Sequence, residues 1–135
     1  MSERMTKDEL DAQRTLGALN PVGHAILVFP SGTAAADAKK ALLGAGFADA
    51  DIVSYGAREL FPDLDTMMRS ASGAAGFGYE ITLMRRYMTL ASEGCAFVVV
   101  YVPEDEQTTK ATEVAKRFGA KSAVRYARLA SEDLI

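Results

Sequence analysis

The residues whose types and spacing best suit ligand binding lie between Ser70 and Glu80, in the longest run of small residues in the chain. Three glycines stand there directly before an amphipathic segment, and the backbone amides at a helix N-terminus attract anions. An arginine on either side of the run would add positive charge. The candidate ligand-binding residues are therefore Arg69, Ser70, Gly73, Gly76, Gly78, Glu80 and Arg85.

The same glycines have a structural interpretation. Their spacing is G-x-x-G-x-G, which differs from the dinucleotide pattern G-x-G-x-x-G and from the P-loop pattern. The run also follows a predicted helix rather than a strand, and the carboxylate of Glu80 would repel an anion bound nearby. Small residues would instead let two helices turn and pack closely, and the pattern favours this second interpretation.

Glu80 is the one charged residue inside the apolar arc of a helix predicted from Tyr79 to Glu93. A carboxyl on an apolar face is a candidate general acid or base, with His24 or a tyrosine as its partner. The alternative is a first-turn glutamate that interacts with the helix dipole and pairs with Arg69 or another arginine. No second catalytic group has a spacing that demands the enzymatic role, so we expect no catalytic residue and no enzyme.

Cys95 and His24 are the only cysteine and the only histidine in the chain. One of each cannot form a zinc site, and a lone cysteine excludes an intrachain disulfide, which fits a reducing cytoplasm. Cys95 lies in a strongly apolar run, so we expect a buried packing thiol rather than a nucleophile. The sequence therefore predicts no cofactor and no metal.

The composition is that of an ordinary globular protein. The 135 residues are 49% hydrophobic and 24% charged, with a formal net charge of −3. Such a chain lacks the basic face that nucleic acids attract. The polar N-terminus does not resemble a signal peptide, and the longest apolar run, residues 95–102, is shorter than the roughly 20 residues that span a bilayer. We expect a cytoplasmic protein that binds neither nucleic acid nor membrane.

Two parts of the chain share one order of elements: an apolar strand, a turn with proline, a helix, a glycine and a weaker strand. The apolar strands are predicted at 24–29 and 95–102, and the weaker ones at 51–57 and 122–129. Thr33 is the predicted N-cap of the first helix. An offset of about 73 residues superimposes the two parts. It matches the buried faces Ala38, Ala41, Leu42 and Ala45 with Ala111, Val114, Ala115 and Phe118, the glycines Gly46 with Gly119, and Tyr55 with Tyr126.

Two such repeats predict an α+β fold, a ferredoxin-like sandwich built on an antiparallel sheet of strand order 4-1-3-2. The apolar first and third strands would be central, and the second and fourth would be the edges. The two repeat helices cover one face, so the inserted helices, the N-terminal helix or another subunit must cover the other. We expect an N-terminal helical extension at 1–21, with a capping box at Thr6 and Glu9, and one domain at 22–135 with a helical insert at 59–94.

The segment from Ala25 to Val53 has an apolar strand, an alanine-rich helix, the pair Gly46-Phe47 and then Asp51-Ile52-Val53. This segment resembles the heat-induced stress protein domain of small bacterial general stress proteins, in which a glycine-rich insert also divides two halves. The resemblance implies a cytoplasmic, oligomeric, non-enzymatic stress protein. The N-terminal helix departs from the family pattern, and the insert is more amphipathic than a membrane segment.

Two functions follow as hypotheses. The first is a stress-response binding or assembly module that forms a homo-oligomer through its sheet or its inserted helices. The alternative is a sensor that binds a small anionic metabolite or nucleotide between Arg69, the glycine run and Arg85.

Overall fold

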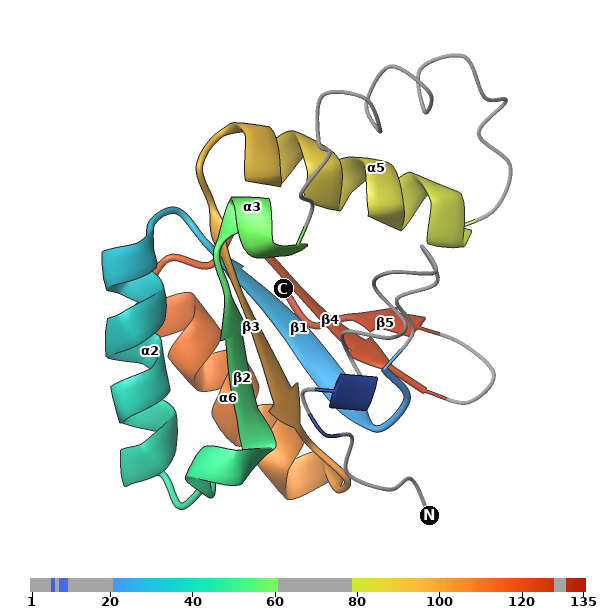
Figure 1. Ribbon diagram of the computed structural model, residues 1–135. Coiled ribbons are helices and arrows are strands. Elements are labelled where there is room, and N and C mark those ends of the chain that lie inside the picture. The colour runs from blue at the N-terminus through green and yellow to red at the C-terminus, as the bar shows by residue number, and fades with distance from the viewer. Residues whose placement is uncertain (1–5, 7, 10–20, 61–78, 128–130) are drawn as a thin grey trace.

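The computed structural model describes residues 6, 8–9, 21–60, 79–127 and 131–135. Helices cover both faces of a sheet whose five strands run in the order β2-β3-β1-β4-β5, and every neighbouring pair is antiparallel (Figure 1). The α+β class is therefore confirmed. The strands are β1 (His24–Phe29), β2 (Ile52–Tyr55), β3 (Ala96–Tyr101), β4 (Ser122–Tyr126) and β5 (Ser131–Asp133).

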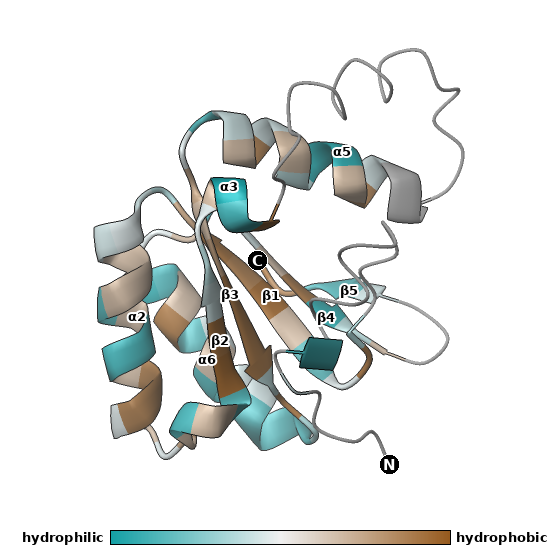
Figure 2. Ribbon diagram, viewed as in Figure 1, coloured by the Kyte–Doolittle hydropathy of each residue, from teal (hydrophilic) through white to brown (hydrophobic). Residues whose placement is uncertain are grey.

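The predicted central strands are central. β1 lies between β3 and β4, and its register pairs His24 with Tyr101 and Phe29 with Ala96. All six β1 side chains are buried, because helices cover the sheet on both sides. Figure 2 shows the hydrophobic colour along β1 and β3, while the helices alternate between hydrophilic and hydrophobic stretches.

One predicted edge is wrong. β4 is not an edge strand, because β5 pairs with it and places Arg125 opposite Glu132. The backbone amide of Leu134 donates to the carbonyl of Ala123 at 2.8 Å, and the Leu134 side chain packs on the core. Main-chain hydrogen bonds and one apolar side chain thus hold a strand whose own residues have little β-propensity.

The helices form two layers. α2 (Gly32–Gly44) and α6 (Asp105–Arg117) pack on one face of the sheet, while α3 (Ala57–Leu60) and α5 (Tyr79–Ser92) pack on the other (Figure 1). A short 3₁₀ turn, η1 (Asp49–Asp51), precedes β2. We call the interior under α2 and α6 the repeat core and the interior under α3 and α5 the insert core. Inserted helices therefore cover the face of the sheet opposite α2 and α6, which is one of the three coverings that the sequence predicted.

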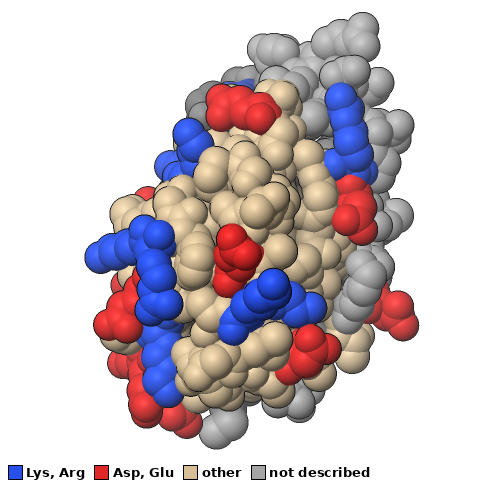
Figure 3. Space-filling model, turned by 90° about the vertical axis from the view of Figure 1, so that its left-hand side faces the viewer, with Lys and Arg blue, Asp and Glu red and all other residues tan. Residues whose placement is uncertain are grey.

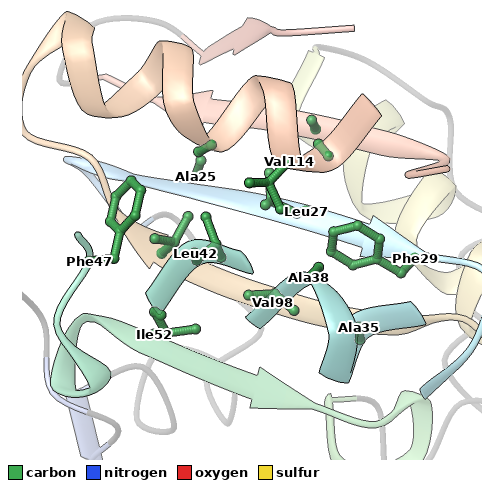
Figure 4. Packing of buried hydrophobic residues seen from close by; sticks show 14 of the residues in the cluster. Ala25, Leu27, Phe29, Ala35, Ala38, Leu42, Phe47, Ile52, Val98 and Val114 are labelled. Carbon is green, nitrogen blue, oxygen red and sulfur yellow. The ribbon is translucent and has the colours of Figure 1, made fainter. Parts of the chain in front are cut away.

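The repeat core is almost entirely aliphatic. Leu42 and Ala38 of α2 point at Leu27 and Val98 of the sheet, and Phe47 closes one end (Figure 4). In α6, Ala111, Val114 and Ala115 are buried at the positions that the repeat predicted. Burying a leucine side chain stabilises the folded state by about 1.5–3 kcal/mol, so this layer is a major source of stability.

The predicted glycine C-caps are confirmed for the helices of both repeats. Gly46 and Gly119 have positive φ angles of 107° and 71°, which side chains with a Cβ rarely adopt. The amide of the following residue then donates to the carbonyl five residues back, from Phe47 to Leu42 at 3.1 Å and from Ala120 to Ala115 at 2.9 Å. This geometry is the Schellman motif, which satisfies carbonyls at the helix end.

Two predicted boundaries are wrong. The N-cap of α2 is Ser31 rather than Thr33, since Ser31 is extended and its Oγ accepts from the amide of Ala34 at 3.1 Å. The second strand ends at Tyr55, because the carboxylate of Glu59 accepts from the amide of Gly56 at 2.9 Å and helps start α3. The capping box at Thr6 and Glu9 is confirmed, with both reciprocal bonds at 3.2–3.3 Å.

Candidate functional site

Most of the predicted ligand site falls outside the described residues. Arg69, Ser70, Gly73, Gly76 and Gly78 lie there, as does the side chain of Glu80, whose backbone belongs to α5. Of the seven predicted residues, only Arg85 has a described side chain. The anion site therefore stays a prediction from the sequence.

The two arginines of α5 differ in their surroundings. Arg86 is exposed and its guanidinium lies 3.5 Å from the carboxylate of Asp133 in β5. Arg85 is half-buried, and its Nε atom is shielded from solvent. The predicted solvated face is thus right for Arg86, whereas the Arg85 side chain is only partly solvated.

The insert core holds a buried pair of tyrosines. The hydroxyl of Tyr87 in α5 lies 2.8 Å from that of Tyr126 in β4, and the Tyr87 ring meets Phe97 edge-on with 5.8 Å between centroids. Tyr55 and Tyr126, the pair matched in the repeat, are both buried in this core. Tyr87 lies in the helix predicted from Tyr79 to Glu93, but its hydrogen-bonding partner could not be predicted, because the contact joins positions 39 residues apart.

His24 continues this polar line across the sheet. The register that pairs Ala25 with Arg125 sets Tyr126 beside His24, and His24 faces Tyr101 on its other side with 5.1 Å between ring centroids. His24 is 2% exposed, and its Nδ1 lies 3.1 Å from the carbonyl of Val22. Burial lowers the pKa of His24, so the imidazole is neutral at pH 7 and Nδ1 carries the proton donated to that carbonyl.

Cys95 is buried at the start of β3, as the sequence predicted. Burial, with the carboxylate of Glu93 nearby, raises the pKa of the Cys95 thiol. A protonated thiol is a weak nucleophile, so Cys95 acts in packing.

The structure separates His24 from Cys95. His24 pairs with Tyr101 at one end of β3, whereas Cys95 precedes Ala96 at the other end. Cys95 lies six residues before Tyr101, so at about 3.4 Å per strand residue the two side chains are roughly 20 Å apart along the sheet. A catalytic pair of these two residues is therefore excluded. Within the described ranges, no three His, Cys, Asp or Glu side chains come together as a metal site.

The charged surface is mixed rather than one-sided. Figure 3 shows Lys and Arg beside Asp and Glu on the side of the molecule that carries α2. Among the pairs, Lys39 lies 3.4 Å from Asp49, and Arg125 lies 3.1 Å from Asp105. Exposed ion pairs of this kind contribute about 0–1 kcal/mol each, and on the side of the molecule in Figure 3 the described residues form no large basic patch.

Comparison with protein-family models, with curated proteins and with solved structures found no match. In the described part of the chain, no helix combines the length and the apolar content needed to cross a bilayer.

The two edges of the sheet remain as the elements open to a partner. Among the strands that the structure describes, β2 pairs with β3 alone and β5 with β4 alone, so each has one side with no described strand next to it. In β2, Ile52 and Tyr55 are buried, Val53 is half-buried and Ser54 is exposed. The edges, rather than the faces, are thus the candidate contact sites.

Proposed function

We propose that this protein is a non-enzymatic assembly module that forms a homo-oligomer in a bacterial stress response. One observation carries the proposal. Helices cover both faces of the sheet, whereas in the described part of the chain no strand pairs with the outer edge of β2, where Ser54 is exposed. An open edge presents unpaired amides and carbonyls to a further strand, and backbone pairing needs no catalytic group.

The buried titratable groups support a structural role for the interior. His24 donates to a backbone carbonyl, Cys95 packs as a thiol, and Tyr87 pairs with Tyr126. Each is at most 4% exposed, so a substrate in solution would not reach it. The polar atoms of His24 and of the two tyrosines are used within the fold, and the tyrosine contact joins α5 to β4.

The strand arrangement supports the ferredoxin-like part of the proposal. The first four strands lie in the order β2-β3-β1-β4 with antiparallel neighbours, as two interleaved strand-helix-strand units require. β5 then extends that sandwich by one strand. The stress-response and cytoplasmic parts rest on the family resemblance of Ala25 to Val53 and on the single free thiol.

Light scattering coupled to size exclusion tests the assembly over a dilution series. We expect a mass that is a multiple of 14.4 kDa at high concentration and that falls on dilution. A mass of 14.4 kDa at every concentration would contradict the proposal.

A small anionic ligand is the second candidate function. Arg85 favours it, because this half-buried arginine, seven residues after Gly78 in the sequence, offers a positive charge in a partly desolvated setting. A thermal-shift screen of nucleotides and phosphorylated metabolites tests it. The stabilisation should disappear in Arg69→Ala and Arg85→Ala but persist in Arg86→Ala, the exposed neighbour; a shift that survives all three changes counts against the site.

A further inference from the structure

We propose that two copies of this chain pair through β2, so that their five-stranded sheets join edge to edge about a two-fold axis. This inference rests on the proposed function and names its interface. A second copy is the proposed occupant because the residues of β2 are compatible with pairing to an identical strand, whereas those of β5 are not.

The β5 edge resists self-pairing. Its residues are Ser131, Glu132 and Asp133, and both acids are exposed. In an isologous pair the same residues meet, so acids from the two copies would face each other. Like charges opposite one another destabilise a strand pair. Charged residues on a short edge strand are a common protection against association.

The β2 edge has no such protection. The strand contains Ile52, Val53, Ser54 and Tyr55, without a charge or a proline. A two-fold axis perpendicular to the sheet keeps each side chain on its own face, so either Val53 or Ser54 meets its own copy at the centre. Both residues are tolerated at that position, because Val53 would form a pair of β-branched side chains and Ser54 a pair of hydroxyls.

The charges that flank β2 complement each other in the antiparallel arrangement. Asp49 and Asp51 precede the strand, whereas Arg58 follows it on α3. Antiparallel pairing brings the start of one β2 toward the end of the other, so the exposed Asp49 of one copy, whose carboxylate also lies 3.4 Å from Lys39, approaches the arginine of its partner. Arg58 is exposed and forms no ion pair with another described residue. Glu59 is occupied by its hydrogen bond to the amide of Gly56.

Ser54→Lys tests the interface by dimer dissociation in light scattering. An exposed lysine at the centre of both copies should weaken dimerisation at least tenfold, while the melting temperature at low concentration stays near that of the parent protein. Ser54→Thr keeps the size and β-propensity of the edge and should retain the dimer. Glu132→Lys on the opposite edge should retain it too.

Cross-linking gives an independent readout. Because Cys95 is buried, a short bis-maleimide should not join two parent molecules, whereas Ser54→Cys should give a covalent dimer and Glu132→Cys should not. If the parent protein oligomerises but Ser54→Lys dissociates no more readily, the β2 interface is wrong and the assembly proposal stands. A strictly monomeric parent protein overturns both. A Ser54→Cys variant that cross-links only to other proteins assigns the edge to a different partner and overturns the two-fold pairing.

Discussion

The two cores of this protein differ in what fills them. The repeat core is built from alanine, valine, leucine, isoleucine and phenylalanine side chains supplied mainly by the two repeats. The insert core contains Tyr55, Tyr87, Tyr126 and Cys95, and His24 borders it on the same face of the sheet. Among the described residues, the buried histidine, cysteine and tyrosine side chains thus all lie on one face of the sheet.

This difference indicates that the two cores have different roles in the fold. Aliphatic packing stabilises without fixing one orientation, whereas buried hydroxyls must find partners in particular directions. α2 follows β1 and α6 follows β3 in the chain with only a short turn between, so each helix is positioned by its strand. α5, by contrast, begins 19 residues after the end of α3. The contact between the Tyr87 and Tyr126 hydroxyls in the insert core therefore helps to fix where α5 docks on the sheet.

Leu42→Ala should have the largest effect. Leu42 is fully buried at the centre of the repeat core, so the change leaves a cavity and should lower the free energy of unfolding by about 2–5 kcal/mol. Urea unfolding followed by circular dichroism measures it. Leu43→Ala in the next position is the control, since Leu43 is 40% exposed and its loss should cost no more than about 0.5 kcal/mol. Equal losses would contradict the assignment of this core.

The tyrosine pair tests the insert core. Tyr87→Phe and Tyr126→Phe each remove one hydroxyl of a buried contact at 2.8 Å, so their effects should not add. We expect a coupling of about 0.5–1.5 kcal/mol in the double-mutant cycle. Amide exchange should show the losses concentrated in α5. Strict additivity would show that the two hydroxyls do not depend on each other.

His24 makes the same core sensitive to pH. Burial holds the pKa of His24 below its usual value near 6.5, so the unfolded chain takes up a proton before the folded protein does. The stability that depends on neutral His24 is fully present above pH 6.5, and it should fall as the pH drops toward the lowered pKa of His24 in the folded protein. Because His24 is the only histidine, one imidazole signal in NMR reports its titration.

The charged groups around His24 act against this shift. The carboxylates of Asp51 and Glu9 favour the imidazolium, but desolvation is the stronger influence. The matched variant is His24→Phe, which keeps a ring beside Tyr101 and should remove the loss of urea stability between about pH 6.5 and 5.5. An NMR midpoint at or above 6.5 would contradict the burial argument.

The sequence predicted those parts of the fold that depend on neighbouring residues. Helix ends at Gly46 and Gly119 follow from local backbone preference, and β1 and β3 follow from continuous apolar runs. β5 could not be predicted, because Ser131–Asp133 has no strand pattern of its own. It forms a strand through pairing with the edge of β4 and through the packing of Leu134 on the core.

The candidate sites show the same limit. The edge position of β2 is predicted correctly from its weaker apolar pattern, but the fold is needed to show that Ser54 is its exposed residue. Likewise, Tyr87 and Tyr126 read as apolar-face residues until the docking of α5 brings their hydroxyls together. Local patterns identify which residues are buried, whereas contacts between distant segments decide which of them interact.

Arg86→Ala should have the smallest effect of the four. Arg86 and Asp133 join α5 to β5, but their side chains are 42% and 48% exposed and water screens the pair. The change should lower the free energy of unfolding by about 0–1 kcal/mol, and added salt should reduce the difference. The comparison with Tyr87→Phe is informative, because both residues tether the same helix. If Arg86→Ala loosened α5 more than Tyr87→Phe in amide exchange, surface charge rather than the buried hydroxyl pair would position the insert.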